Sequence, residues 1–260
     1  MIKSKLFSSW RGFRLAFFDE GDRFAPVVLL LHGFTSSAMI NWFSPGWVQL
    51  LCDNGFRVVL IDNLGHGESD KPHNLTNYNL VFMAADAVSL LDYLGINRAH
   101  VIGYSMGARI ACSMALFYSS YVCSLVLGGV GSGLYDSEVI DWNPVLDSFL
   151  LPSINDVQCL LGKTFRNFAE NVPGNDLNAL ASCLAMTRKL FNKEDLKRID
   201  VPALIAVGSK DTIAGSPQEL LSVLQNGQYL NILNRDHMLS VGDKQFKQGV
   251  IDFYSGIISK

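Results

Sequence analysis

The sequence predicts an α/β protein with a mostly parallel, doubly wound sheet and an inserted helical lid. Short β-rich apolar runs alternate with longer segments of helical periodicity, which is typical of a parallel sheet covered by helices. Several short runs are apolar throughout, as expected for strands buried on both faces. With 260 residues, the chain is long enough to bury a sizeable core.

The composition favours a compact globule and excludes several classes of partner. Hydrophobic residues make up 49% of the chain and charged residues 17%, against about 25% charged residues in typical domains. The formal net charge is −3, and no stripe of Lys and Arg appears, so we expect no nucleic-acid partner.

The N-terminal stretch does not resemble a secretory signal, because Arg11 and Arg14 stand where its apolar region should run. The apolar run at 27–31 is far too short to span a bilayer. The five cysteines are odd in number, scattered and embedded in apolar stretches, which predicts buried, reduced thiols. No cysteine or histidine spacing indicates a metal site. We therefore expect a cytoplasmic protein without stable membrane insertion and without a metal.

Seven segments are expected to be strands: 13–18, 27–31, 57–61, 99–103, 124–128, 203–207 and 228–233. Helical periodicity fills the gaps, most clearly at 79–94 and 246–257. Between 131 and 199 no convincing strand occurs, and helical patterns lie near 138–151, 154–168, 177–190 and 193–197. We interpret 131–199 as a lid inserted into a core formed by 1–130 and 200–260. The alternative is an ordinary long crossover between two strands.

The segment 103–107 reads Gly-Tyr-Ser-Met-Gly, directly after an expected strand and before a stretch of small helical residues. Gly-x-Ser-x-Gly in this setting is a nucleophile elbow, a strained turn that exposes the hydroxyl of Ser105 above the sheet. A side chain at Gly103 or Gly107 would collide where strand and helix approach closely. The alternative is an ordinary glycine-rich turn.

A serine hydroxyl needs a base to remove its proton and, usually, a carboxylate to orient that base. After an elbow, these partners follow in the order Ser, acid, His. Only His237 is eligible, since four histidines precede Ser105: His32, His66, His73 and His100. Asp211 stands at the carboxyl end of an expected strand, where catalytic side chains cluster in open sheets. Its rival is Asp236, which as the sequence neighbour of His237 is poorly placed to face the imidazole.

Acyl transfer also requires hydrogen-bond donors for the oxyanion. We expect one donor to be the backbone N–H of Met106, at the N-terminus of the helix after the elbow. The other is expected to be the N–H of Phe34, after the strand at 27–31, where Gly33 lets the backbone approach. His32 is expected to support this loop rather than to react.

Taken together and in order, five features resemble the α/β-hydrolase superfamily over nearly the whole chain: His-Gly-Phe at 32–34, Asp-Asn-Leu-Gly-His-Gly-Glu-Ser at 62–69, Gly-Tyr-Ser-Met-Gly at 103–107, Gly-Ser-Lys-Asp at 208–211, and His237. The resemblance implies a Ser–His–Asp triad, no cofactor, a lid after the sixth strand, and a structural role for the turn at 62–69. Some relatives, such as epoxide hydrolases, use an aspartate as the nucleophile, and Ser105 at that position excludes this class for the present chain. Relatives usually have glycine where Asp236 stands, so the geometry of the histidine loop is a point to check.

Three functional hypotheses remain. The leading one is a serine hydrolase that cleaves a small-molecule carboxylic ester or thioester through an acyl-enzyme. The second is hydrolysis of a carbon–carbon bond in a ring-fission dienoate, with Arg109, Arg166 or Arg188 holding the substrate carboxylate. The third is a ligand-binding protein with slow turnover. Apolar residues of the expected lid predict a pocket for an apolar acyl or alcohol group: Leu146, Phe149, Leu150, Phe165, Phe168, Leu184 and Met186.

Overall fold

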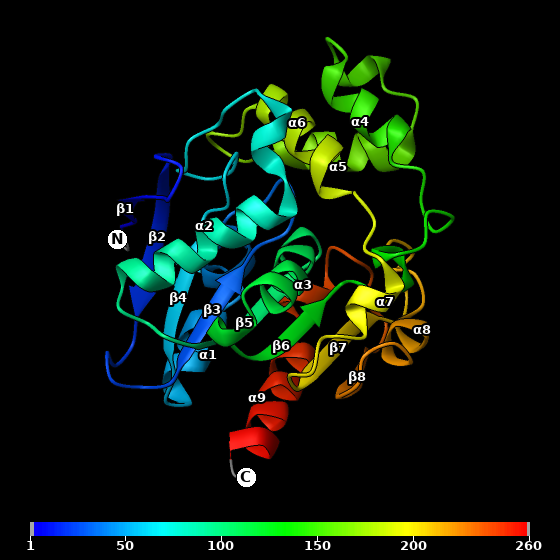
Figure 1. Ribbon diagram of the computed structural model, residues 1–260. Helices are drawn as coiled ribbons and strands as arrows, with labels where there is room; N and C mark the ends of the chain where they lie inside the picture. The colour runs from blue at the N-terminus through cyan, green and yellow to red at the C-terminus, as the bar shows by residue number, and fades with distance from the viewer. Residues whose placement is uncertain (1–2, 259–260) are drawn as a thin grey trace.

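Eight strands form one sheet, in the order β1-β2-β4-β3-β5-β6-β7-β8, within residues 3–258 that the computed structural model describes (Figure 1). The strands are β1 Lys5–Ser8, β2 Arg14–Glu20, β3 Val27–Leu31, β4 Arg57–Ile61, β5 Ala99–Tyr104, β6 Val122–Gly128, β7 Ala203–Gly208 and β8 Gly227–Ile232. The pairs β1–β2 and β2–β4 are antiparallel, and all other pairs are parallel. The predicted mostly parallel sheet is therefore confirmed.

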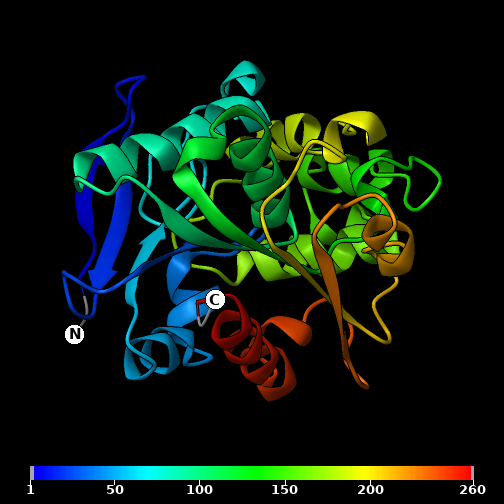
Figure 2. The same cartoon turned by 60° about the horizontal axis from the view of Figure 1, so that its bottom comes forward.

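Helices cover both faces of the sheet (Figure 2). On one face lie α2 (Leu80–Tyr93) and α3 (Met106–Phe117), and on the other lie α1 (Trp47–Asp53) and α9 (Lys244–Ile258). Alternate side chains of β3 enter the two cores: Leu29 and Leu31 face α2 and α3, whereas Val28 and Leu30 face α1 and α9. All four are fully buried, which explains why this strand is apolar at every position.

Four helices follow β6 and precede β7, and no strand occurs between them within the described residues. They are α4 (Asn143–Leu150), α5 (Leu160–Glu170), α6 (Leu177–Thr187) and α7 (Lys193–Leu196), and α8 (Pro217–Leu221) comes after β7. Figure 1 shows α4, α5 and α6 gathered beyond one end of the sheet. Polar contacts join this β6–β7 segment (131–199) to the rest of the chain: Asn175 Nδ2 donates to Thr35 O at 3.0 Å, and His73 Nε2 lies 2.9 Å from Asp176 Oδ2.

Several expected boundaries need correction. β1 escaped prediction because it has four residues, of which only Phe7 is buried. The helix expected from 138 begins at Asn143, because Asp136 and Asp141 accept the backbone N–H groups of Glu138 and Asn143 in local turns. The helix expected at 154–168 begins at Leu160, after a separate 3₁₀ turn at Ile154–Asp156.

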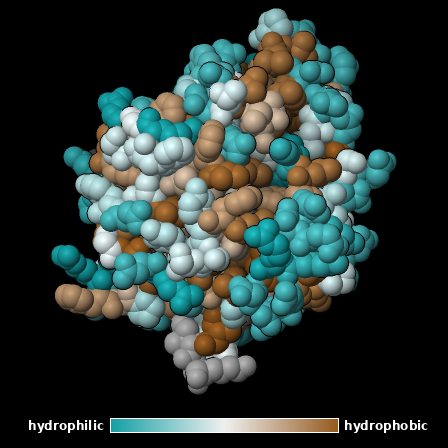
Figure 3. Space-filling view, in the orientation of Figure 1, coloured by the Kyte–Doolittle hydropathy of each residue, from teal (hydrophilic) through white to brown (hydrophobic). Residues whose placement is uncertain are grey.

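The cysteines are all free, but only Cys112 and Cys183 are buried, and the other three are half-buried. Within residues 3–258 no helix is long and apolar enough to cross a membrane. The start of the N-terminal stretch considered above, residues 1–2, and the expected end of the core, residue 260, lie outside the described residues. Apolar side chains gather across the middle of the face shown in Figure 3, below α4 and α5.

Candidate active site

Ser105 occupies a strained turn between β5 and α3. Its φ is +52°, a left-handed value that non-glycine residues rarely adopt, and its N–H donates to Gly128 O at 2.8 Å. A Cβ on Gly103 would overlap the backbone of Gly107, and one on Gly107 would overlap the carbonyl of Leu31. Both glycines of the motif are therefore required by the close approach of strand and helix, for the steric reason inferred from the sequence.

The structure brings Ser105, His237 and Asp211 into one hydrogen-bonded chain. His237 Nε2 lies 3.0 Å from Ser105 Oγ, and His237 Nδ1 lies 2.8 Å from Asp211 Oδ2. The other carboxylate oxygen, Asp211 Oδ1, accepts the backbone N–H groups of Ile213 (2.8 Å) and Ala214 (3.0 Å). Burial of Asp211 favours a raised pKa, but the hydrogen bond and electrostatic interaction with His237, together with the two backbone amides, lower the pKa below its usual value. An ionised Asp211 holds the proton of the imidazole on Nδ1, which leaves Nε2 free to accept a proton from Ser105.

Asp236 makes no hydrogen bond or ion pair with the imidazole of His237, whose two nitrogens face Asp211 and Ser105. Its carboxylate accepts the N–H groups of Met238 and Leu239 at 3.0 and 2.9 Å, and so shapes the loop after β8. The same loop is held by Tyr104, whose hydroxyl donates to the carbonyl of His237 at 2.6 Å. These bonds fix the histidine loop without the glycine that relatives usually have. Sequence reasoning missed the role of Tyr104, since it stands at a variable position of the elbow motif.

Two backbone amides close to the nucleophile lack partners: Met106 follows Ser105 in the chain, and Phe34 lines the same cavity as Ser105. Within the described residues, neither the N–H of Phe34 nor that of Met106 donates a hydrogen bond to protein. Met106 is the first residue of α3, so the positive end of the helix dipole adds to the field at its N–H. Thr35, the next residue after Phe34, has φ +64°, a second strained position at the site. Unpaired, preorganised amides of this kind can stabilise a developing oxyanion.

Two side chains, those of His32 and Asn41, support the loop that carries Phe34. His32 accepts the N–H of Asn63 on Nε2 at 2.9 Å and lies 2.8 Å from Gly33 O through Nδ1, so it is a neutral, fully buried support. Burial lowers the pKa of His32, which agrees with this neutral state. Asn41 Oδ1 accepts the N–H of Gly33 at 2.7 Å. Asn41 was missed because no motif marks it, and its side chain reaches the loop only through the fold.

The turn at 62–69 is structural, as expected. Asp62 accepts the N–H groups of Ala38 (2.7 Å) and Glu68 (2.9 Å), and a Cβ on Gly67 would overlap its carboxylate. The described residues hold no group of three or more His, Cys, Asp or Glu side chains that could bind a metal ion.

A mostly apolar cavity of about 380 Å³ opens onto Ser105 and His237. From the β6–β7 segment, it is lined by Phe165 and Phe168 of α5. Other apolar residues expected at the pocket serve elsewhere: the ring of Phe149 packs 5.4 Å from that of Phe34, and Leu150 is exposed. Helical periodicity in the sequence could not separate side chains that line the pocket from those that hold the segment in place.

The three arginines considered as carboxylate ligands differ in their partners. Arg109 donates to the carbonyls of Thr187, Gly133 and Lys189 at 2.8, 3.1 and 2.8 Å. Arg166 bonds to Glu170 Oε1 at 2.6 Å and to two backbone carbonyls. Arg188 makes no hydrogen bond or ion pair with any described residue, and its Nε and Nη2 are shielded from solvent.

Comparison with known proteins gives one family. A family model described as alpha/beta hydrolase fold matches residues 26–234. A Bacillus subtilis (strain 168) protein, provisionally named 2-succinyl-6-hydroxy-2,4-cyclohexadiene-1-carboxylate synthase, is 39% identical over 123 residues, which are 47% of this chain and 43% of that protein. The pig (Sus scrofa) bifunctional epoxide hydrolase 2 is 33% identical over 168 residues, 60% of this chain and 29% of that protein. The matched segments thus span less than half of each of these curated relatives.

Solved structures share the fold over nearly the whole chain. An esterase from Exiguobacterium antarcticum superposes with a TM-score of 0.79 at 19% identity, covering 97% of this chain and 100% of that one. A meta-cleavage product hydrolase from Pseudomonas fluorescens IP01 superposes with a TM-score of 0.73 at 24% identity, covering 98% of both chains. At these identities the likeness shows the fold alone.

Proposed function

The chain belongs to the α/β-hydrolase fold family, and within it we propose that this protein is a serine hydrolase that cleaves a carboxylic ester or thioester through an acyl-enzyme. The observation that carries the proposal is the hydrogen-bonded chain from Ser105 through His237 to Asp211, beside two unpaired amides. Membership of the family supports a hydrolase activity. That the scissile bond is an ester or thioester is our inference from the serine nucleophile.

The proposed reaction has two half-reactions. Ser105 Oγ bonds to the acyl carbon while His237 Nε2 accepts the hydroxyl proton, and the amides of Phe34 and Met106 stabilise the oxyanion. The bond to the alcohol or thiol then breaks, and the imidazolium gives its proton to that leaving group. In the second half-reaction, water attacks the acyl-enzyme by the same steps, His237 accepts its proton and returns it to Ser105, and the acid is released. Asp211 stabilises the imidazolium in both halves.

Epoxide hydrolases are numerous among the relatives, so the nucleophile needs separate consideration. The family resemblance implies an aspartate nucleophile in those enzymes, whose carboxylate opens the epoxide ring. Here the elbow carries Ser105, within 3.0 Å of a base that can accept its proton. A serine activated in this way is suited to attack on an acyl carbon, and this supports an ester or thioester rather than an epoxide as substrate.

A second candidate is hydrolysis of a carbon–carbon bond in a ring-fission dienoate. The observation that favours it is Arg188, a half-buried residue whose Nε and Nη2 are shielded from solvent and make no hydrogen bond, and which could hold the carboxylate of such a substrate. The apolar cavity with Phe165 and Phe168 fits either reaction. We propose in addition that residues 131–199 act as a lid that selects the substrate and supplies no catalytic group.

A fluorophosphonate probe tests the nucleophile. One label should appear on the peptide that contains Ser105, and Ser105→Ala should abolish both the label and turnover. Ser113→Ala, which removes another buried serine of α3, is the matched control and should keep the label. Labelling of a different serine, or none in folded protein, would refute the proposal.

A substrate panel tests the scissile bond. Nitrophenyl esters of increasing acyl length, one acyl thioester and one ring-fission dienoate should be compared by kcat/KM. We expect ester or thioester turnover to exceed dienoate turnover. Turnover of the dienoate alone would favour the second candidate, and turnover of none by a labelled protein would favour slow-turnover binding.

A further inference from the structure

Asn175, in the turn between α5 and α6, donates two hydrogen bonds through its side-chain nitrogen. Its Nδ2 lies 3.0 Å from Thr35 O and 3.1 Å from Ala169 O, in the last turn of α5. Both acceptors are carbonyl oxygens, so the opposite orientation of the amide would place Oδ1 against two acceptors. Oδ1 itself is shielded from solvent and has no hydrogen-bond partner among the described residues. This position therefore uses the donors of the side chain and leaves its acceptor unsatisfied.

The carbonyl that Asn175 binds belongs to a strained residue of the oxyanion loop (residues 33–36), which carries the proposed donor Phe34. Thr35 is fully buried, and its φ of +64° is rare for a β-branched residue. Such a conformation persists only where the surrounding contacts determine it. Within the loop, Thr35 Oγ1 donates to Phe34 O at 2.6 Å. The bond from Asn175 holds the carbonyl of Thr35 from outside the loop.

The amide of Phe34 thus lies between supports from two different parts of the chain. On the side of the core, Asn41 Oδ1 accepts the N–H of Gly33 at 2.7 Å. On the side of the β6–β7 segment, the Phe34 ring packs 5.4 Å from that of Phe149, and Asn175 binds the next residue. A peptide group is planar and turns only with its neighbours, so bonds to both flanking residues restrict the direction of the Phe34 N–H.

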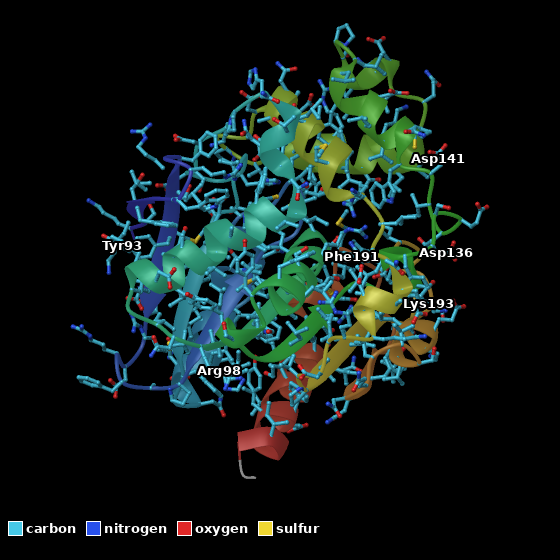
Figure 4. All side chains as sticks on the ribbon, viewed as in Figure 1. Tyr93, Arg98, Asp136, Asp141, Phe191 and Lys193 are labelled. Carbon is cyan, nitrogen blue, oxygen red and sulfur yellow. The ribbon has the colours of Figure 1, made fainter. Side chains whose placement is uncertain are left out.

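The turn that carries Asn175 is anchored to the core independently of the two connections that join the β6–β7 segment to its strands. His73, in the loop after β4, lies 2.9 Å through Nε2 from Asp176 Oδ2, and its carbonyl accepts the hydroxyl of Ser182 at 2.6 Å. Figure 4 shows labelled residues of both connections on one side of the molecule: Asp136, Asp141, Phe191 and Lys193. Loss of the bond from Asn175 therefore leaves the segment attached at several other points.

We infer that Asn175 is a positioning residue for the oxyanion donor. It holds Thr35 so that the N–H of Phe34 keeps the direction needed when negative charge develops on the acyl oxygen. The inference rests on the proposed hydrolase function and adds a residue of the β6–β7 segment to the support of the oxyanion site. Through Asn175 the segment supports a donor without supplying a group that reacts.

Asn175→Ala tests the inference because it removes the bond to Thr35 O. Complete removal of an oxyanion donor costs about 10²–10³ in kcat, and a displaced donor should cost less. With nitrophenyl butyrate we expect kcat to fall about tenfold and KM to stay within about twofold, because the donor bond strengthens only as charge develops. The dissociation constant of 1,1,1-trifluoro-2-hexanone, which adds to Ser105 as a tetrahedral alkoxide, should rise by a similar factor.

Asn175→Asp is the second variant, because it keeps the size of the side chain but replaces its donors by acceptors. Its kcat should fall at least as far as that of Asn175→Ala. Asn178→Asp is the matched control, since it makes the same replacement on an exposed side chain of the same segment. It should leave kcat, KM and the affinity for the trifluoromethyl ketone within about twofold of the wild type. Circular dichroism shows whether each variant is folded.

The outcomes separate the inference from the proposed function. Unchanged kcat and unchanged affinity for the ketone in a folded Asn175→Ala overturn the inference, and so does a change confined to KM or to the thermal midpoint. Absence of ester turnover by the wild type contradicts the proposed hydrolase function instead. The rate of fluorophosphonate labelling then decides the inference alone, because the phosphoryl oxygen gains negative charge beside the same donor, and the rate in Asn175→Ala should fall about tenfold. A wild type that is neither active nor labelled overturns both.

Discussion

Replacement of Asp211 by Asn should disable the base through the tautomer of His237. Asp211 Oδ1 accepts two backbone N–H groups, from Ile213 and Ala214, and Oδ2 faces His237 Nδ1. An asparagine that keeps its oxygen toward the amides must point its NH₂ at Nδ1, which then accepts. The imidazole proton moves to Nε2, which faces Ser105 and can no longer accept its proton.

The magnitude follows from the cost of the opposite orientation. Turning the amide so that its oxygen faces His237 leaves the Ile213 and Ala214 amides unpaired, and the side chain of residue 211 is fully buried. Each unpaired buried donor costs about 1–3 kcal/mol, so the productive orientation lies about 2–6 kcal/mol higher. This corresponds to a loss of about 30-fold to 10⁴-fold in kcat, and the same change in another triad gives about 10⁴.

The assay is steady-state hydrolysis of a nitrophenyl ester, with the rate of fluorophosphonate labelling as a second readout and circular dichroism as a check of folding. Asp236→Asn is the control. Its side-chain oxygen can still accept the amides of Met238 and Leu239, so kcat should stay within about threefold. A larger loss from Asp236→Asn than from Asp211→Asn, or a loss below tenfold from a folded Asp211→Asn, would refute the assignment.

Three further perturbations test the pocket, the pH dependence and the elbow. Phe168 lines both the catalytic cavity and a neighbouring cavity of about 690 Å³, so Phe168→Ala should shift ester preference toward longer acyl chains, and an unchanged chain-length preference would contradict the pocket assignment. Phe149 packs against Phe34 instead, so Phe149→Ala should lower the free energy of unfolding by about 3–5 kcal/mol in urea titrations. Burial lowers the pKa of His66 from 6.5 to about 3, so unfolded protein takes up the proton first as pH falls below 6.5. Stability from His66 is therefore complete above that pH and should decline by about 2 kcal/mol between pH 8 and pH 5, and His66→Gln should flatten this slope in denaturant titrations at each pH. Gly107→Ala should lower the free energy of unfolding by about 3 kcal/mol or more and abolish turnover, since its Cβ would overlap the carbonyl of Leu31; a stable, active variant would show that the elbow can relax.

The sequence by itself predicted β2 to β8, but not the short edge strand β1, and it predicted the candidate site residues at the strand ends. The strand at 27–31 was predicted at its observed limits because Val28, Leu29, Leu30 and Leu31 are buried on both faces, and burial of that kind leaves an unbroken apolar run. The elbow could be predicted because the close contact at Gly107 leaves no room for a side chain, and the sequence shows directly that this position is glycine.

Only the tertiary structure decided which side chains meet. Asp211 and Asp236 are both acids near the end of the chain, and strand order together with loop direction places the first against His237 and turns the second onto its own backbone. Asn41 and Tyr104 support the site through contacts between segments distant in sequence, which local patterns do not encode. The same holds for Arg188, whose residue type predicts a charge, while the absence of a described partner arises only when the chain packs around it. Local sequence determines the secondary structure and the burial pattern of each segment, whereas the packing of segments distant in sequence determines which groups each side chain contacts.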